Sequence, residues 1–337
     1  MTLRAMESFG HAPTGAVTSA DLLSNQWTSI AGGLALVDLT GGRKYVYRTS
    51  GAGNLTLDLD SDLSTLVLGL RLHNIKSTTR EYLAVFLDGI QVLGLLMKDV
   101  ATSKLVYIRG ASFLDPRILV STAATAVGSN DHWTAKVVFD NVAGSVEFYQ
   151  NGVLDSSVAG VDTINAGTDC DTIAIFATYA EYGTAGLSDI WVDDVTNHGE
   201  TSVLYRPVDG VGSSADWTPT GAASNWECTD EVPPDDDTTY NASTTSSDLD
   251  QLAQAGMDGA VGSVLAVQAH VRARKETAAG ATIKVGLLHG VTHSQSLAMA
   301  LSTSYEQRTE IFEDVPGGAG WTSAQLDATQ VSYENTT

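Results

Sequence analysis

The fold is decided by a stretch that reads His132-Trp-Thr-Ala-Lys-Val-Val-Phe-Asp140 and then Gly144-Ser-Val-Glu-Phe-Tyr-Gln-Asn-Gly-Val-Leu154. Apolar residues alternate with polar ones in both runs, which is typical of strands with one buried face. Asn151-Gly152 predicts a tight turn, because both residues tolerate the positive φ angles of a two-residue hairpin. The stretch therefore predicts a strand followed by a β-hairpin.

The same pattern continues along most of the 337 residues. Asp88-Gly89 separates two apolar runs, 82–87 and 90–96, and predicts a second hairpin. Only residues 248–257 show helical spacing, so we expect a short surface helix there. Many short strands without crossover helices predict an all-β fold, a sandwich or barrel, and argue against a doubly wound α/β fold. Further strand-like runs lie at 55–60, 65–72, 104–109, 172–176, 187–193, 263–272, 281–288, 305–312 and 328–333.

Composition changes between residues 196 and 237, where Gly, Ser, Thr, Asp and Pro replace most apolar residues. Strand patterns resume afterwards. We therefore expect two β-domains, residues 1–206 and residues 207–337, with no internal sequence repeat between them.

Two motifs in residues 1–206 resemble a known family. The Trp-led strand at Trp133, with a later strand ending in Tyr149-Gln-Asn-Gly-Val153, is similar to the core of laminin-G-like, concanavalin A-type jelly rolls. Ala185-Gly-Leu-Ser-Asp-Ile-Trp-Val-Asp-Asp194 resembles their closing strand. The resemblance implies a jelly-roll β-sandwich for 1–206, followed by a smaller β-sandwich.

Other segments are similar to virion proteins of tailed phages. They are Glu7-Ser-Phe-Gly-His11 with Asp21-Leu-Leu23 and Trp27, Trp226-Glu-Cys-Thr-Asp-Glu231 with Asp236-Asp-Thr-Thr-Tyr240, Val267-Gln-Ala-His-Val-Arg-Ala-Arg-Lys275 and Gly320-Trp-Thr322. The run after Trp321 departs from the pattern and leaves the role of the last strand open. The resemblance implies a structural protein of the tail or capsid exterior, such as a fibre, spike or decoration protein.

That reading implies specific partners and a location. The partners would be other virion proteins, copies of the chain itself and host-surface glycans, and the protein would be made in the host cytoplasm. The N-terminal residues contain no apolar segment typical of a signal peptide, and the most apolar window, 82–97, is too short to span a bilayer. A carbohydrate-binding adhesion module and a polysaccharide-degrading enzyme remain the alternatives.

The charge balance excludes one class of partner. Asp and Glu total 40 against 18 Lys and Arg, a net charge of −22, so the chain lacks the basic clusters that neutralise nucleic-acid phosphates. Hydrophobic residues make up 43%, which excludes intrinsic disorder. We expect the carboxylates to form an even coat on outward strand positions and turns, which would keep an exterior protein soluble.

Glycosidases occur among concanavalin A-type folds, so the resemblance raises catalysis as a possible function. The retaining glucanases of that class resemble Glu-x-Asp-x-x-Glu on one strand, with two carboxylates at catalytic separation. The corresponding run here, Asp189-Ile-Trp-Val-Asp-Asp194, has no Glu and the wrong spacing. We therefore expect no enzyme and no catalytic residue, with Asp193 and Asp194 as strand-end and turn residues.

Other polar patterns have simple structural interpretations. Asp58, Asp60 and Asp62 lack the Gly and Glu of a calcium loop and alternate with leucines, so we expect a solvent-facing strand. Asp235–Asp237 form either a solvated loop or a calcium site; we expect no cofactor. The remaining candidates, each interpreted as structural, are His289 with His293, Gly210-Val-Gly-Ser-Ser-Ala215, and the cysteines Cys170 and Cys228, whose pairing the sequence leaves open.

Six tryptophans complete the set of candidate binding residues. Trp133 and Trp191 lie in strand patterns and are expected in the core. Trp27, Trp217, Trp226 and Trp321 lie near loops, where an exposed ring could stack on a sugar or pack between domains or subunits.

Overall fold

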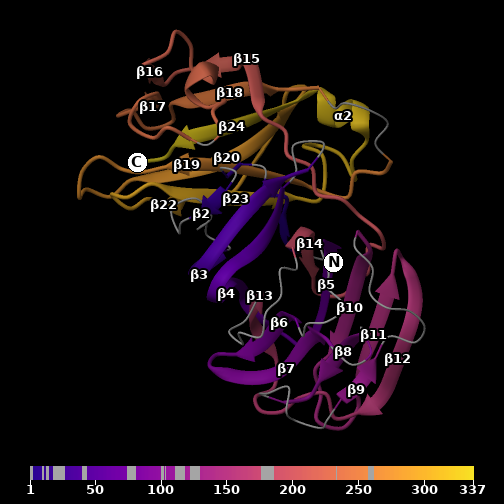
Figure 1. The fold of residues 1–337 in the computed structure, drawn as a ribbon. Coiled ribbons are helices and arrows are strands. Elements are labelled where there is room, and N and C mark those ends of the chain that lie inside the picture. The colour runs from indigo at the N-terminus through magenta and orange to yellow at the C-terminus, as the bar shows by residue number, and fades with distance from the viewer. Residues whose placement is uncertain are drawn as a thin grey trace. The chain divides into compact units, whose positions relative to one another are not determined.

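The computed structural model describes residues 3–9, 11–12, 15–17, 27–39, 44–73, 81–99, 102, 104–110, 118–121, 130–175, 186–232, 234–256 and 262–337. Nearly all elements are antiparallel β-strands (Figure 1), which confirms the predicted all-β class. The chain forms two compact units. The N-terminal unit holds the described residues up to Leu204, and the C-terminal unit holds those from Tyr205 onward together with His11 and Ala12.

The N-terminal unit is built from two runs of neighbouring strands. The first run, in spatial order, is β12 (Val153–Val161), β11 (Gly144–Gln150), β10 (His132–Val138), β5 (Thr65–His73), β14 (Gly186–Asp193) and β1 (Leu3–Glu7). The second is β13 (Cys170–Ile175), β6 (Glu81–Asp88), β7 (Gln91–Lys98), β8 (Leu105–Ile108) and β9 (Ile118–Ser121). The long β4 (Lys44–Leu63) pairs with β14 and β13 and joins the runs, and β3 (Trp27–Asp38) pairs with β4 and β2 (Gly15–Val17).

Aromatic residues fill the interior of this unit. The Phe86 ring lies 5.8 Å from that of Phe139 and 6.0 Å from that of Tyr107, which is fully buried. The Tyr107 hydroxyl donates to the carbonyl of Thr163 at 3.0 Å, which satisfies its polar end. A Cβ on Gly94 would lie 2.1 Å from that hydroxyl, so only glycine fits beneath the ring.

Both predicted hairpins are present. The turn between β6 and β7 contains Gly89 with φ 56°, and the turn between β11 and β12 contains Asn151 at φ 48° and Gly152 at φ 80°. Both turns use the positive φ angles that the sequence indicated.

The C-terminal unit is a smaller β-sandwich. Its main sheet follows the order β15 (Val208–Ala215), β18 (Leu249–Gln254), β24 (Thr329–Asn335), β20 (Thr282–His289) and β21 (Thr292–Gln295), with β22 (Met299–Ala300) also on β20. The pair β19 (Val267–Ala273) and β23 (Glu306–Phe312) packs against it through a core containing Ala269, Val285, Leu287 and Trp321. The short strands β16 (Thr218–Thr220) and β17 (Tyr240–Ala242) pair with each other. The 3-10 helix η1 (Trp226–Cys228) lies in the segment that connects them.

The helix predicted for residues 248–257 is wrong, because residues 249–254 form β18. Leu249, Leu252 and Ala253 mimic a helical period, but the side chain that turns inward beside Leu252 is the carboxylate of Asp250. Pairing with β24 and β15 overrides the local pattern. An α-helix forms elsewhere, at α2 (Ser323–Asp327), which begins at a capping box in which Thr322 and Gln325 exchange hydrogen bonds.

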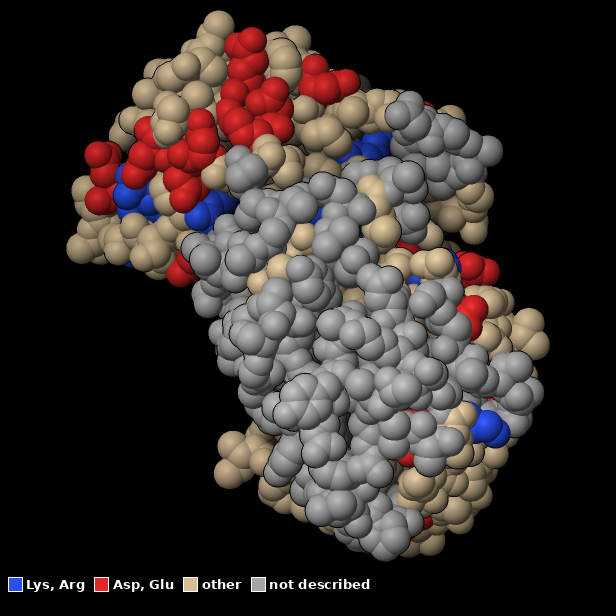
Figure 2. Space-filling model, in the orientation of Figure 1, with Lys and Arg blue, Asp and Glu red and all other residues tan. Residues whose placement is uncertain are grey.

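The acidic coat is uneven, contrary to the expectation. Between Arg206 and Arg272 the sequence has eleven Asp and Glu and no Lys or Arg, and Figure 2 shows neighbouring carboxylates on the described surface of the C-terminal unit. Asp189, Asp193 and Asp250 are fully buried. Within the described residues, no helix is both long and apolar enough to span a membrane.

Candidate functional site

A set of polar and aromatic side chains lies on one face of β10, β5 and β14 in the N-terminal unit. The register places His132 opposite Arg71, and Thr134 opposite Gly69, which in turn faces Trp191. Because side chains alternate across a strand, these residues share the face opposite the one that carries the buried Trp133. We call this set the polar face.

Trp191 lies flat across the polar face. A Cβ on Gly69 would lie 2.0 Å from the indole, so the glycine gives the ring its place. The indole Nε1 donates to His132 Nε2 at 3.3 Å, and the His198 ring packs edge-on at 5.0 Å between centroids. Trp191 is therefore buried, as predicted, but against polar neighbours.

Arg71 is held between two carboxylates. Its Nε donates to Asp189 at 3.0 Å and its second guanidinium nitrogen to Glu200 at 3.1 Å. Asp189 sits at a β-bulge of β14 with φ 50°, and its other oxygen accepts the N–H of Val203 at 2.9 Å. Two elements far apart in sequence are thus tied to one buried aspartate.

Asp193 ends β14 and starts a turn, as the sequence predicted. Its Oδ1 accepts the N–H groups of Val195 and Thr196, and its Oδ2 lies 2.9 Å from His198 Nε2. Burial opposes ionisation, but the hydrogen bonds from His198 and the two N–H groups outweigh it and lower the Asp193 pKa. Asp194 pairs with Arg4 at 3.0 Å, which also fits a structural role.

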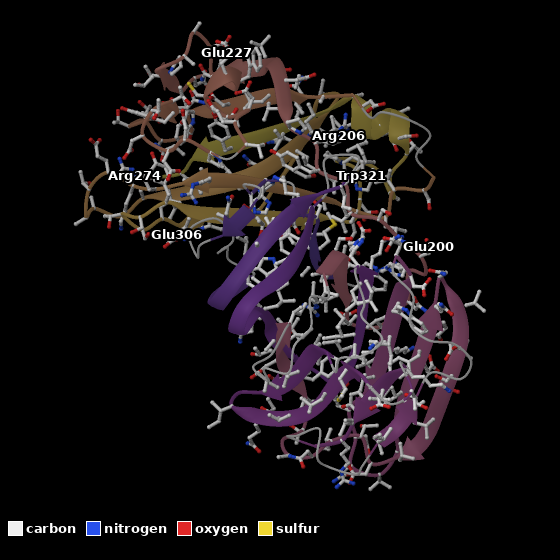
Figure 3. All side chains as sticks on the ribbon, in the orientation of Figure 1. Glu200, Arg206, Glu227, Arg274, Glu306 and Trp321 are labelled. Carbon is white, nitrogen blue, oxygen red and sulfur yellow. The ribbon has the colours of Figure 1, made fainter. Side chains whose placement is uncertain are left out.

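Residues 194–204, which we call the closing segment, cover the polar face. His198 lies on Trp191, Glu200 pairs with Arg71, and Val203 donates to Asp189. The segment also approaches the β11–β12 turn, where a Cβ on Gly152 would lie 3.4 Å from the Glu200 nitrogen. The place over this face where a ligand could meet Trp191 is therefore occupied by the chain itself. Glu200, which belongs to the closing segment, is labelled in Figure 3.

Two buried polar atoms of β10 lie under this cover. His132 Nδ1 and Thr134 Oγ1 have no hydrogen-bond partner, and both residues are at most 1% exposed. Burial, followed by the nearby Arg71 charge, lowers the His132 pKa to about 4. His132 is therefore neutral at pH 7 and acts as an acceptor for the Trp191 indole.

One arrangement resembles a nucleophile with its base. His73 Nε2 lies 2.8 Å from Ser188 Oγ, and its Nδ1 lies 3.1 Å from Asn130 Oδ1. This order of groups could activate a serine. Ser188, however, has no exposed surface, so its hydroxyl offers no substrate a path of attack in this structure. The arrangement acts here as a satisfied internal network.

The aspartate clusters singled out in the sequence lie on other elements, in β4 and in the loop that precedes β17. Asp58, Asp60 and Asp62 are exposed on β4 between buried leucines, which confirms the solvent-facing strand. Asp236 binds Arg272 at 2.6 Å, and Asp237 binds Arg274 at 2.7 Å.

The loop at 235–237 is therefore fixed by ion pairs and is not simply solvated, because Arg272 and Arg274 neutralise two of its carboxylates. Asp235 accepts from the backbone and hydroxyl of Thr239. Across the described part of the chain, no group of three His, Cys, Asp or Glu side chains has the geometry of a metal site.

The remaining candidates have structural positions. His289 and His293 lie on β20 and β21, and His293 Nε2 is 2.7 Å from Ser332 Oγ. Gly210–Ala215 belongs to β15 and precedes no helix. Cys170 and Cys228 are buried free thiols, and burial raises both pKa values, that of Cys170 to about 12. Neither thiol is activated for chemistry.

No tryptophan offers an exposed stacking surface, although all six are described. Trp27 and Trp321 are buried, and Trp217 and Trp226 are half-buried. Trp27 donates to Glu7 at 3.1 Å, and Trp217 packs edge-on against Tyr333. The contacts of the loop tryptophans are packing contacts within one unit; the sequence had offered sugar stacking or packing between domains or subunits, and these contacts are neither.

Sequence reasoning missed the residues that define the polar face. Arg71 and His132 each lie in a strand pattern where nothing distinguishes them from solvent-facing residues. Glu200 lies in a region whose composition indicated only a linker. The bulge that turns Asp189 inward leaves no signature in the sequence.

Comparison with known proteins yields likenesses in fold alone. No family model matches the chain, and no curated protein matches it. Among solved structures, a sialidase is similar with a TM-score of 0.40 and 11% identity, over 57% of this chain and 18% of that one. The CBM2 module of an evolved Dit protein of Lactobacillus casei BL23 phage J-1 is similar with a TM-score of 0.36 and 10% identity, over 58% and 97%.

A third likeness is to domain 4 of an extracellular arabinanase from Geobacillus stearothermophilus, solved with arabinotriose. Its TM-score is 0.35 and its identity 14%, over 57% of this chain and 91% of that domain. The matches span very different shares of the solved chains, from 97% of the phage Dit module to 18% of the sialidase. What these names say applies to those proteins.

Proposed function

We propose that this protein is a non-enzymatic structural component of the exterior of a tailed-phage virion, made in the host cytoplasm and packed against copies of itself and other virion proteins. The observation that carries the proposal is the closing segment. Its contacts with Trp191, Arg71 and Asp189 fill the face on which the jelly roll gathers its reactive side chains. Because the closing segment already occupies the polar face, this face suits a rigid structural part of a particle.

The segments that resemble virion proteins support this proposal through their contacts. Glu7 accepts the N–H of Phe9 at 2.6 Å and the indole N–H of Trp27 at 3.1 Å. Phe9 is fully buried and adopts φ 57°, a strained conformation that a specific fold must hold. The resemblance at Glu7–Phe9 and Trp27 thus concerns residues that interact.

Binding to host-surface glycans would need stacking residues other than tryptophan. The four loop tryptophans are committed to packing, so a substitution there would test folding as much as binding. Carbohydrate binding therefore enters the proposal only as contact with the host surface, and no specific observation favours it as the main function.

Mass spectrometry of purified virions, with antibody labelling of intact particles in electron micrographs, tests the proposal. We expect the chain among the virion proteins and the label on the particle surface. Absence of the chain from virions would overturn the proposal. Depolymerisation of host polysaccharide by the purified protein, lost on changing one Asp or Glu, would replace it with an enzyme.

A further inference from the structure

We infer that the free edge of the main sheet in the C-terminal unit, residues 291–297 around β21, is an interface through which two copies of this chain pair strand to strand. This deepens the proposed function, because it names the surface by which copies meet. We call these residues the β21 edge. Purified protein suffices for its test, so its failure is distinct from absence of the chain from virions.

The β21 edge presents unused backbone groups. Among the strands of the described residues, β21 is the last of its sheet, and it pairs with β20 from Thr292 to Gln295 without a register shift. Ser296 donates its N–H to Val285, which sets the alternation of hydrogen bonds along the strand. By that alternation Thr292 and Ser294 bond to β20, while the N–H and C=O groups of His293 and Gln295 point outward.

The edge lacks the usual protection against pairing. Natural edge strands are guarded by Lys, Pro, bulges or charges. The chain has no Asp, Glu, Lys or Arg between Lys284 and Glu306. By contrast, β12 in the N-terminal unit carries two register shifts against β11, which interrupt its free edge.

Two aliphatic side chains stand almost fully in solvent at the ends of this edge. Val291, in the turn between β20 and β21, is 99% exposed, and Leu297, two residues beyond the end of β21, is 87% exposed. Their midpoint is Ser294. An antiparallel pairing of two copies about a two-fold axis at Ser294 would bring Val291 of each copy opposite Leu297 of the other.

The same two-fold axis at Ser294 also fits the hydrogen-bonding pattern of the backbone. It places His293 opposite Gln295 of the second copy, and these are the two residues whose N–H and C=O groups point outward. Each such pair exchanges two hydrogen bonds in an antiparallel ladder. The apolar contacts and the backbone pattern thus agree on one register.

The charge of the chain favours a second copy at this place. Two chains of net charge −22 repel each other, and the repulsion is reduced where the segments that meet, here residues 291–297, contain no charged residue of their own. A strand pair of this length buries less than the ~1,200 Å² of stable complexes, so we expect a dissociation constant of roughly 1 µM to 1 mM. Added salt should tighten it by screening the repulsion.

Sedimentation equilibrium over a wide concentration series tests the interface. The parent chain should form dimers, and Val291→Lys or Leu297→Glu should weaken dimerisation about tenfold or more. The double variant Val291→Lys/Leu297→Glu should recover much of the loss, because the new lysine of one copy faces the new glutamate of the other. Gln295→Pro removes an outward N–H that β20 does not use, and should abolish pairing while the unit stays folded.

Ile90→Lys is the matched control. Ile90 is 98% exposed at the β6–β7 turn, outside the β21 edge, so this change should leave dimerisation unaltered. Circular dichroism confirms that each variant is folded. A parent chain that remains monomeric at every concentration, a dimer insensitive to all three edge variants, or a double variant weaker than both single ones would overturn the inference.

Discussion

Asp250 of β18 and Tyr333 of β24 share a hydrogen bond of 2.7 Å in the interior of the C-terminal unit. The Asn225 side chain donates to the same carboxylate oxygen at 2.6 Å, and the backbone N–H of Trp217 donates to the other oxygen at 3.0 Å. One buried carboxylate therefore joins the main sheet to the loops that carry η1. Burial, and then the Asp250 charge, raise the Tyr333 pKa well above its usual value.

Removing this carboxylate should destabilise the C-terminal unit strongly. Asp250→Ala leaves three hydrogen-bond donors without an acceptor. Each buried donor without a partner costs ~1–3 kcal/mol, so we expect the free energy of unfolding to fall by at least ~3 kcal/mol. Tyr333→Phe removes one donor and should cost about 1 kcal/mol. Urea denaturation followed by tryptophan fluorescence measures both. Equal, negligible losses would mean that the network contributes nothing to stability.

Gly69 should not tolerate a side chain. Gly69→Ala forces a methyl group into the Trp191 ring, 2.0 Å away, and we expect a loss of about 3 kcal/mol. Gly280→Ala is the matched control, because no atom lies within 4 Å of its Cβ and its φ is not positive. Thermal unfolding should separate the two variants clearly; similar melting temperatures would contradict the account of Trp191.

His132 should make the N-terminal unit less stable in mild acid. Its pKa is lowered from 6.5 to about 4 in the folded state, so between those values the unfolded chain binds more protons. Stability from this group is full above pH 6.5 and is lost as the pH falls toward 4, by up to about 3 kcal/mol.

His132→Gln separates this effect from the titration of carboxylates. The variant keeps an acceptor for Trp191 but does not titrate, so the slope of unfolding free energy between pH 4 and 6.5 should be flatter than in the parent. Parallel slopes in the two proteins would show that His132 is not neutral and buried as described.

Calcium should not stabilise the loop at Asp235–Asp237. Arg272 and Arg274 already pair with Asp236 and Asp237, and both guanidiniums flank the Tyr305 ring, at 5.4 and 4.9 Å. We expect the same melting temperature with calcium and with a chelator. A calcium-dependent rise would revive the metal site that the sequence left open.

Tyr305→Ala should loosen the same loop. It removes the ring that both guanidiniums contact and the hydroxyl that donates to Asp237 at 3.0 Å, which together contribute about 1 kcal/mol at a partly exposed site. Tyr305→Phe keeps the ring and should cost less. Proteolysis within residues 229–240 provides the readout, and equal cleavage of all three proteins would contradict it.

The sequence predicted those parts of the fold that depend on local chemistry. Asn151-Gly152 and Asp88-Gly89 encode turns through backbone preference alone, and alternation marks the strands between them. β18 was misassigned because its inward partner is Asp250, a residue that a pattern of apolar positions counts as exposed. Burial of that carboxylate is decided by Tyr333, 83 residues away.

The candidate site was beyond such prediction for a related reason. The polar face exists because Asp189 sits at a bulge and because Glu200 and His198 return over β5 and β14. Each contact joins residues far apart in sequence, in a stretch whose composition suggests a linker. The capping box Thr322-x-x-Gln325 of α2, in contrast, is a local signal that could have been read.

The most direct test of the account is hydrogen exchange of the closing segment. The N–H groups of Val195, Thr196 and Val203 are bound to Asp193 and Asp189, so peptides covering residues 194–204 should exchange as slowly as neighbouring strands, with or without polysaccharide present. Exchange at the rate of an unprotected loop, or release of protection when a glycan is added, would contradict a permanently covered polar face.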